Sequence, residues 1–549
     1  MTKSFVFGSN RKIKIIAGLL AGIMLTGCGA SATGQSQTTE KGTEVEANAP
    51  AWQKYADDPI TLDWYVNYSW FVTGWGENLV SKKITEETGV SLNFITPLGT
   101  EEEKLNALIS SDTLPDVITL GWWEPQYLDM IRNGQVYALN ELADQYDPYF
   151  YQVADSQVVD WFTMPDGNVY GYPNSSITPQ DVEENDNITS NQTFLVRKDI
   201  YEAIGSPDMS TPEGFHNAVK KAAQMFPEVD GKDLIPVGAH VFNETGCTSF
   251  DQYLLNFLAV PYEKDGQYYD RYSDPEYHIW LKMFRQMYQE GYLKDDIFVD
   301  SRIQTSEKLS EGRYFCLMYQ WTDVQDQQKI LYSKDPNSIY IAVEGPRNSK
   351  RDDPILATGG INGWTVTLVS KNCEHPERAI AFIDYLLSEY GQMRTSLGVE
   401  GETYDIIDGK YVVRPDVQKL LNTDREKYDK LYGAASTYWM LQDTIMEKKW
   451  TSGFQEPIKQ MADWTMQYAT YLGQYDIFVD SESEVGLAKE RTDKLWGVTI
   501  KQLLLAESDE EFDEIFEQYR KERDKMGWSL LMEESTRQMN ENKKRLGME

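Results

Sequence analysis

The sequence predicts an α/β fold with two lobes, in which helices cover a mainly parallel sheet. Strand-like and helical segments alternate through residues 61–120, and this alternation is typical of parallel sheets. The chain has 549 residues, more than one hydrophobic core usually supports. Aromatic residues make up 13% of it, which excludes a mainly disordered protein.

The first elements follow one another closely. The segment before residue 90 is helical and closes at Gly89, and the next six residues alternate with period two. Leu105, Leu108 and Ile109 share one helical face, after three acidic residues that suit the N-terminal end of a helix. The expected strands are 61–66, 90–95 and 116–120, and the expected helices are 79–87 and 101–111.

Later segments are more helical. Thr211 and Pro212 are start signals for a helix whose apolar stripe continues to Phe226. Another helix is expected over 376–390, and the segment 416–549 is expected to be mostly helical.

The N-terminal residues match an export signal. Cationic side chains precede an apolar run over residues 15–25, which is too short to span a bilayer. The run ends at Leu25-Thr26-Gly27-Cys28, which resembles the lipobox of bacterial lipoproteins. In that family the signal is removed and the new N-terminal residue, here Cys28, carries lipid such as palmitate. The resemblance implies a signal peptide over 1–27 and a lipid-anchored protein on the extracellular face of the bacterial membrane.

The charge of the chain limits its partners. Removal of residues 1–27 takes away four positive charges and no negative one, so the formal charge falls from −35 to −39. Nucleic acids and anionic headgroups bind basic patches, so we expect no nucleic acid and membrane contact through lipid alone. A strongly anionic ligand is also disfavoured. Residues 28–54 are mainly small and polar, which predicts a flexible tether.

The remaining cysteines are Cys247, Cys316 and Cys373. Their odd number and their spacings match no metal site or disulfide framework. We expect three unpaired buried thiols, with one disulfide as the alternative.

No catalytic or cofactor motif occurs. The nucleophile elbow, the His-Glu-x-x-His zinc motif, Cys-x-x-Cys and the glycine-rich phosphate and dinucleotide motifs are all missing. The four histidines are far apart and are expected to be structural or solvated. With 87 acidic residues, carboxylate pairs arise by chance and say nothing about glycosidase chemistry. We therefore expect no enzyme, no cofactor and no metal site.

Six short patterns occur in order in the first three quarters of the chain. They lie at residues 113–118, 134–140, 166–173, 194–199, 310–318 and 369–379. Their order and spacing, behind the lipobox, resemble the extracellular solute-binding proteins of ABC importers, in particular the large oligosaccharide-binding lipoproteins. The resemblance covers about residues 55–405.

This resemblance implies a two-lobed periplasmic-binding-protein-like fold, with a ligand cleft between the lobes and an extended helical C-terminal part. In that family the chain crosses between the lobes three times, and the expected crossings here are 170–173, 311–321 and 367–371. We expect lobe 1 to combine 55–170 with 312–367, and lobe 2 to combine 171–311 with 368–549.

Aromatic planes suit the apolar faces of a sugar, so aromatic residues near strand ends are candidates for ligand binding. Trp122 and Trp123 directly follow a predicted strand, where open α/β sheets bind their ligands. Trp364 lies among glycines that allow close backbone approach, and the family often has a cleft aromatic at the place of Trp321. The expected ligand-binding residues are Trp122, Trp123, Trp321, Trp364, Tyr127 and Tyr172, whereas Trp64, Trp280 and Trp496 are expected in the core.

The segment 181–187 is rich in Asp, Glu and Asn, and oxygen-rich loops can bind calcium. It lacks the glycine and the terminal glutamate of an EF-hand loop, so a solvated surface loop is the preferred interpretation.

The resemblance and the aromatic content together predict a monomeric binding protein. It would capture an oligosaccharide and deliver it to the permease subunits of an ABC importer. A binding protein for a peptide or another small solute is the first alternative, because a fold does not determine its ligand. A surface glycoside hydrolase or lyase is the second.

Overall fold

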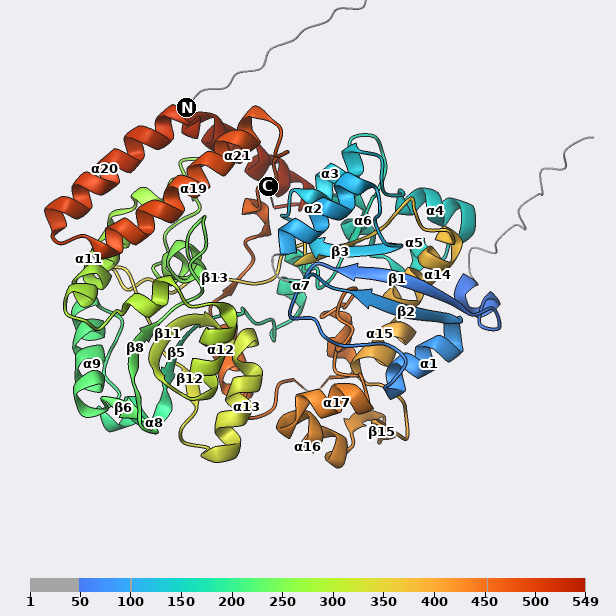
Figure 1. Ribbon diagram of the computed structural model, residues 1–549, viewed down its shortest axis with the longest axis horizontal. Helices are drawn as coiled ribbons and strands as arrows, with labels where there is room; N and C mark the ends of the chain where they lie inside the picture. The colour runs from blue at the N-terminus through green and yellow to red at the C-terminus, as the bar shows by residue number, and fades with distance from the viewer. Residues whose placement is uncertain (1–48, 99–100, 452, 549) are drawn as a thin grey trace, which may run out of the picture. The chain divides into compact units, whose positions relative to one another are not determined.

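The computed structural model describes residues 49–98, 101–451 and 453–548 (Figure 1). Within them, the first sheet has the strand order β2-β1-β3-β14-β4. β1 is parallel to β2 and β3, whereas β14 is antiparallel to β3 and β4. The strands are Ile60–Val66 (β1), Val90–Ile95 (β2), Val117–Gly121 (β3), Tyr172–Pro173 (β4) and Thr365–Val369 (β14).

Helices cover the first sheet and form one hydrophobic core with it. β3 and β14 are buried along their whole length, as expected for strands packed on both faces. The side chain of Asn78 caps α1, and Gly89 ends this helix in the left-handed conformation, as the sequence predicts. The helices of this core are Leu79–Thr88 (α1), Glu101–Ser111 (α2), Gln126–Arg132 (α3), Leu139–Tyr146 (α4), Phe150–Val153 (α5), Ser156–Phe162 (α6), Pro376–Leu387 (α14), Glu389–Ser396 (α15), Pro415–Thr423 (α16) and Arg425–Leu431 (α17).

A second sheet has the strand order β12-β5-β11-β8 and a core of its own. β11 is antiparallel to β5 and parallel to β8. Its strands are Gln192–Arg197 (β5), Ile235–Gly238 (β8), Tyr314–Gln320 (β11) and Tyr340–Ala342 (β12). Its helices include Lys198–Ala203 (α8), Pro212–Met225 (α9), Pro275–Gln289 (α11), Arg302–Ser310 (α12), Gln325–Lys334 (α13), Lys459–Met466 (α18), Glu484–Leu505 (α19), Asp509–Lys525 (α20) and Trp528–Arg545 (α21).

Small two-stranded ribbons complete the described part of the fold. They are Glu228–Val229 with Lys232–Asp233 (β6, β7), Glu263–Lys264 with Gln267–Tyr268 (β9, β10), Leu356–Ala357 with Ala469–Thr470 (β13, β17) and Tyr404–Ile407 with Lys410–Val413 (β15, β16).

The expected division of the chain needs correction in two places. The segment 312–367 was assigned to lobe 1, yet β11 lies between β5 and β8 in the second sheet. The segment 368–549 was assigned to lobe 2, yet α14 is buried in the first core. The composition of a strand does not show to which of the two sheets it belongs, because an apolar strand fits into either one. The strands with which it forms hydrogen bonds determine the sheet.

Counted by the buried residues of the two cores, the chain passes from one core to the other three times within the described residues. The first core ends at Tyr172 and the second begins at Phe194. Further passages lie between Leu356 and Ile361, and between Leu441 and Ile458. The expected crossing at 311–321 is wrong, because that segment is the central strand of the second sheet.

The other local expectations are mostly met. The side chain of Thr211 caps α9, which begins at Pro212. The described part of 416–549 is largely helical, and α19, α20 and α21 pack against one another (Figure 1). Cys247, Cys316 and Cys373 are buried and unpaired, as expected.

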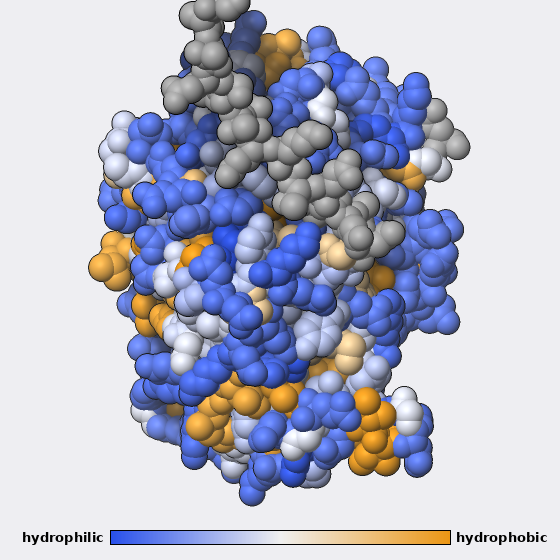
Figure 2. All heavy atoms as spheres, turned by 90° about the vertical axis from the view of Figure 1, so that its right-hand side faces the viewer, coloured by the Kyte–Doolittle hydropathy of each residue, from blue (hydrophilic) through white to orange (hydrophobic). Residues whose placement is uncertain are grey.

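The side of the molecule that faces the viewer in Figure 2 is mainly hydrophilic, with apolar patches at its lower edge and along its left side. Across the residues that the structure describes, every helix is too short or too polar to cross a bilayer.

Candidate functional site

The candidate site lies at one edge of the first sheet. The parallel strands β1 and β3 end there, at Val66 and Gly121. β14 runs the other way and begins at the same edge, since Thr365 is the register partner of Gly121. Open α/β sheets bind their ligands outside the carboxyl ends of parallel strands, so side chains that follow β1 and β3 or precede β14 are candidates.

Four aromatic rings gather at this edge. Trp364, before β14, packs against Trp439, with ring centroids 4.4 Å apart. Trp70, after β1, stacks on both, at 6.4 Å from Trp364 and 5.5 Å from Trp439. Tyr68 contacts all three tryptophans. We call Tyr68, Trp70, Trp364 and Trp439 the edge aromatic cluster. Trp70 is 41% exposed, so part of its ring meets solvent.

The loop that carries Trp70 is held by two carboxylates. Asn67 donates from Nδ2 to Oε2 of Glu124, at 2.6 Å. Ser69 donates from its backbone N–H and from its hydroxyl to Oε1 of Glu101, at 2.9 and 3.1 Å. Burial, and then the charges of Glu124 and Glu101, raise the pKa of Tyr68 well above its usual range. The exposed ring of Trp70 is therefore fixed on a negatively charged support.

Asn174 joins the other two tryptophans. Its Oδ1 accepts hydrogen bonds from the backbone N–H groups of Trp364 and Thr365, at 3.3 and 3.0 Å. Its Nδ2 donates to the backbone carbonyl of Trp439, at 3.2 Å. Asn174 is fully buried and lies in the first passage between the cores. One amide thus positions two aromatic residues that are 75 positions apart in the sequence.

A charged pair from the second core faces the cluster. The guanidinium of Arg302, the first residue of α12, lies 5.8 Å from the ring centroid of Trp70. Nη2 of Arg302 pairs with Oδ2 of Asp323, at 3.0 Å. Asp323 lies in the short 3-10 helix Trp321–Val324, which follows β11. The edge aromatic cluster therefore lies where the first core meets polar groups of the second.

The structure places three of the six predicted site residues at this sheet edge. Trp364 belongs to the edge aromatic cluster itself. Trp122 and Trp123 follow β3, with their rings 6.0 Å apart and nearly perpendicular. Trp123 is 54% exposed, whereas Trp122 packs against the ring of Phe478.

The other three predicted residues are buried, which argues against the roles expected for them. Trp321 is only 3% exposed, and its indole N–H donates to the carbonyl of Ser190 at 2.7 Å. The hydroxyl of Tyr172 accepts from the backbone N–H of Asp155 at 2.9 Å. Tyr127 is buried against Phe478. These rings pack inside the protein, against other aromatic residues such as Phe454, Phe150 and Phe478. Trp64, Trp280 and Trp496 are core residues, as predicted.

Sequence reasoning missed Trp70 and Trp439. A signal for Trp70 was present, because it follows a predicted strand just as Trp122 does. Nothing local marks Trp439, which lies in the less specific C-terminal part of the sequence. It reaches the cluster through its contact with Asn174.

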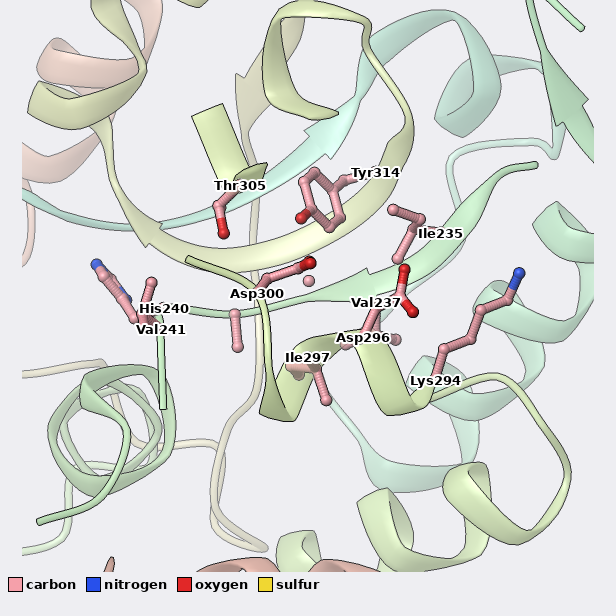
Figure 3. A pocket seen from close by; sticks show the side chains of 12 residues that line it. Ile235, Val237, His240, Val241, Lys294, Asp296, Ile297, Asp300, Thr305 and Tyr314 are labelled. Atoms are coloured by element: carbon pink, nitrogen blue, oxygen red, sulfur yellow. The ribbon is translucent and has the colours of Figure 1, made fainter. Parts of the chain in front are cut away.

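A small cavity lies elsewhere, in the second core (Figure 3). It is lined by groups such as His240, Asp300, Thr305 and Tyr314. Its volume is about 10 Å³, which is room for one water molecule at most. Sugar-sized ligands need several hundred Å³, so this cavity is not their site.

One contact near that cavity resembles a nucleophile with its base. Nδ1 of His240 lies 2.9 Å from Oγ of Ser249. That hydroxyl donates to the carbonyl of Met318 at 2.6 Å, so the imidazole donates to the serine and does not activate it. Burial lowers the pKa of His240 to about 3. Ser249 is fully buried, and the pair is structural.

The acidic segment 181–187 is partly helical and not a simple loop. Helix α7 spans Pro179–Glu184, and Asp181 forms a capping box with Thr178. Asn187 accepts a hydrogen bond from Lys448. In the described ranges, no group of three or more His, Cys, Asp or Glu side chains is placed to hold a metal ion.

The family follows from comparison with known proteins. The model of the bacterial extracellular solute-binding proteins matches residues 72–393, more than half of the chain. The protein belongs to this family. Two solved structures share its fold, the alginate-binding protein AlgQ2 without calcium ion and the S. pneumoniae protein FusA in complex with kestose. Their TM-scores are 0.65 and 0.68 at 18% and 16% identity, over 88% of this chain and 98% and 99% of theirs.

Characterised relatives have low sequence identity to this chain. The polygalacturonan/rhamnogalacturonan-binding protein YtcQ of Bacillus subtilis is 22% identical over 61% of this chain. The lipoprotein LipO of the same organism is 20% identical over 71% of this chain, and the fructooligosaccharide ABC transporter substrate-binding protein FusA of Streptococcus pneumoniae is 22% identical over 54%. The matches span 66%, 73% and 56% of the respective relatives.

Proposed function

We propose that this extracellular solute-binding protein captures an oligosaccharide at the edge aromatic cluster and delivers it to an ABC importer. The observation that carries the proposal is the exposed ring of Trp70, stacked on Trp439 and Trp364 at the sheet edge. Stacked aromatic faces match the apolar faces of pyranose and furanose rings. The relatives named for sugar binding support the same ligand class.

The polar surroundings of the cluster suit hydroxyl groups. Arg302 has several N–H donors, and Asp323 has carboxylate lone pairs. A sugar stacked on Trp70 would present its ring edge to this pair. Trp122 and Trp123 extend the same sheet edge, and we include them in the proposed site as a second place for a sugar unit.

Anchoring through Cys28 is part of the proposal. The lipobox lies outside the described residues, and the similarity to the lipoprotein LipO supports it. The expected tether over 28–54 is too long at its C-terminal end, because Ala51–Lys54 form a 3-10 helix and Ala51 and Trp52 are buried in the first core. A tether that ends before Ala51 would then hold the binding domain above the membrane, within reach of the permease subunits of the importer.

Fluorescence titration of the full-length protein tests the ligand class. Neutral and acidic oligosaccharides of two to five units would be added separately, with dipeptides and tripeptides as the contrasting panel. The proposal expects saturable changes in tryptophan emission with at least one oligosaccharide. Each binding sugar would then be recovered by chromatography after prolonged incubation. Saturation by peptides alone would overturn the ligand class, and shortened sugar products would indicate an enzyme.

A further inference from the structure

The Arg302–Asp323 pair carries information about the charge of the ligand. In the described part of the chain, Arg302 is the cation that the structure places over a ring of the edge aromatic cluster. Its side chain is about half exposed, whereas that of Asp323 is mostly buried. A ligand on Trp70 would thus meet the guanidinium first, with the carboxylate behind it.

The positive charge of Arg302 is already compensated. Oδ2 of Asp323 lies 3.0 Å from Nη2 of Arg302, so the pair offers a ligand no net charge. Glu101 and Glu124 accept hydrogen bonds from the loop that carries Trp70. The charged groups that contact this loop or the ring of Trp70, together with Asp323, are therefore one cation and three carboxylates.

This balance opposes a carboxylate on the ligand. An acidic sugar would have to displace Asp323 from Arg302 or approach three like charges, and like-charge contacts at a binding surface reduce affinity strongly. A neutral sugar avoids that cost. Its hydroxyls can both donate to Asp323 and accept from Arg302, because the pair leaves N–H groups and lone pairs unused.

We infer that Asp323 makes the site selective for neutral over acidic oligosaccharides by neutralising Arg302. This inference rests on the proposed function and deepens it, because it names the ligand subclass and the residue responsible. Asp323 acts here through Arg302 and is a specificity-determining residue.

Matched ligand pairs test the inference. Short oligogalacturonides and oligoalginates would each be used as the free acid and as the methyl ester, so that length and linkage stay constant. Neutral gluco-, galacto-, fructo- and manno-oligosaccharides complete the panel. Calorimetry at pH 7 and at low salt would give the affinity of the full-length protein for each. We expect binding to neutral sugars, and any acid that binds should bind at least about tenfold more weakly than its ester.

Variants locate the effect. Asp323→Asn frees the charge of Arg302 and should shift the acid-to-ester affinity ratio toward the acid by about tenfold. Arg302→Gln combined with Asp323→Asn should restore the acid-to-ester affinity ratio of the wild type. Glu517→Gln is the matched control, because it removes one negative charge from a pair with Arg520 on α20 and should leave the ratio unchanged. Thermal melts would confirm that each variant is folded.

The outcomes separate the two proposals. The inference is overturned if the wild-type protein binds any acid more tightly than its ester. It is also overturned if Asp323→Asn raises the acid-to-ester affinity ratio for none of the ligand pairs. If no sugar of the whole panel binds the wild type, the proposed function itself fails and the inference falls with it.

Discussion

At the scale of single residues, the sequence identified aromatic residues but not which way they face. The same argument from a preceding strand applies to Trp122 and to Trp70, yet only the first was selected. Trp321 was chosen by family position and is buried, with its indole N–H bonded to Ser190. Whether a ring packs inside or meets solvent depends on helices that are distant in the sequence, so local patterns do not decide it.

Truncation of Trp70 tests the binding face. Trp70→Ala removes the exposed ring of the edge aromatic cluster, and central aromatic residues at binding sites often contribute about 2 kcal/mol, roughly thirtyfold in affinity. Calorimetric titration with a sugar that binds the wild type would measure the loss. Tyr332→Ala is the control, since Tyr332 is similarly exposed at 39% on α13 and should retain wild-type affinity. Equal affinity of the wild type and Trp70→Ala would remove Trp70 from the site.

Truncation of Trp321 should act on stability instead. The ring of Trp321 is buried beside the second sheet. Trp321→Ala therefore creates a cavity and leaves the carbonyl of Ser190 without the indole N–H as its donor. Such substitutions cost about 3–5 kcal/mol. Thermal or denaturant unfolding measures the loss, with Trp123→Ala as an exposed tryptophan control. A near-normal unfolding transition for Trp321→Ala would show that the ring is not part of the core.

At the scale of elements, the sequence predicted where helices and strands lie better than which strands pair with one another. The strands at 61–66, 90–95 and 116–120 and the capped helix from Pro212 are close to the observed ones, because caps, glycines and periodicity are local signals. The place of β11 in the second sheet is not local. Its apolar residues pair with β5 and β8, and no residue within it specifies that choice.

The contact between α4 and α14 predicts a pH dependence. Asp384 on α14 is fully buried beside Asp147, which follows α4. Burial, and then the charge of Asp147, raise the pKa of Asp384 well above its usual range. A raised folded-state pKa stabilises the fold below about pH 4, the ordinary range of Asp, and this contribution is lost as the pH rises through the raised value.

Asp384→Asn should therefore stabilise the protein increasingly as the pH rises from about 5 to 8. The amide stays neutral and can donate to Asp147 as the protonated acid would. Urea unfolding at several pH values measures the difference from the wild type. Asp408→Asn, at an exposed turn of the β15–β16 ribbon, is the control. A constant difference across this pH range would contradict the buried acid pair.

At the scale of the whole molecule, the described residues form two hydrophobic cores, and the lipobox lies outside them. The lipobox predicts that the wild type partitions with membranes. Cys28→Ala should release the protein or leave it unprocessed, because the lipidated thiol is lost. Cell fractionation and mass spectrometry of the N-terminus measure this. A wild-type protein in the medium with an unmodified N-terminus would contradict the anchor.

Two α/β cores and three chain passages could be anticipated from length, alternation and family patterns. The proposed binding surface could be anticipated only in part, because it combines Trp70, Trp364 and Trp439 with Arg302 of the other core. These residues lie at four separate places between positions 70 and 439 of the sequence. The hydrogen bonds of Asn174 and the shared sheet edge bring Trp70, Trp364 and Trp439 together. No local sequence pattern indicates either of these arrangements.

Hydrogen–deuterium exchange with and without a saturating oligosaccharide tests whether the sugar binds at the edge aromatic cluster. We expect slower exchange in four segments that meet at this cluster, namely 67–72, 361–364, 437–441 and 301–305. We expect unchanged exchange in α16 and α20. Protection confined to other segments, with the sugar shown to be bound, would contradict a site between the first sheet edge and α12.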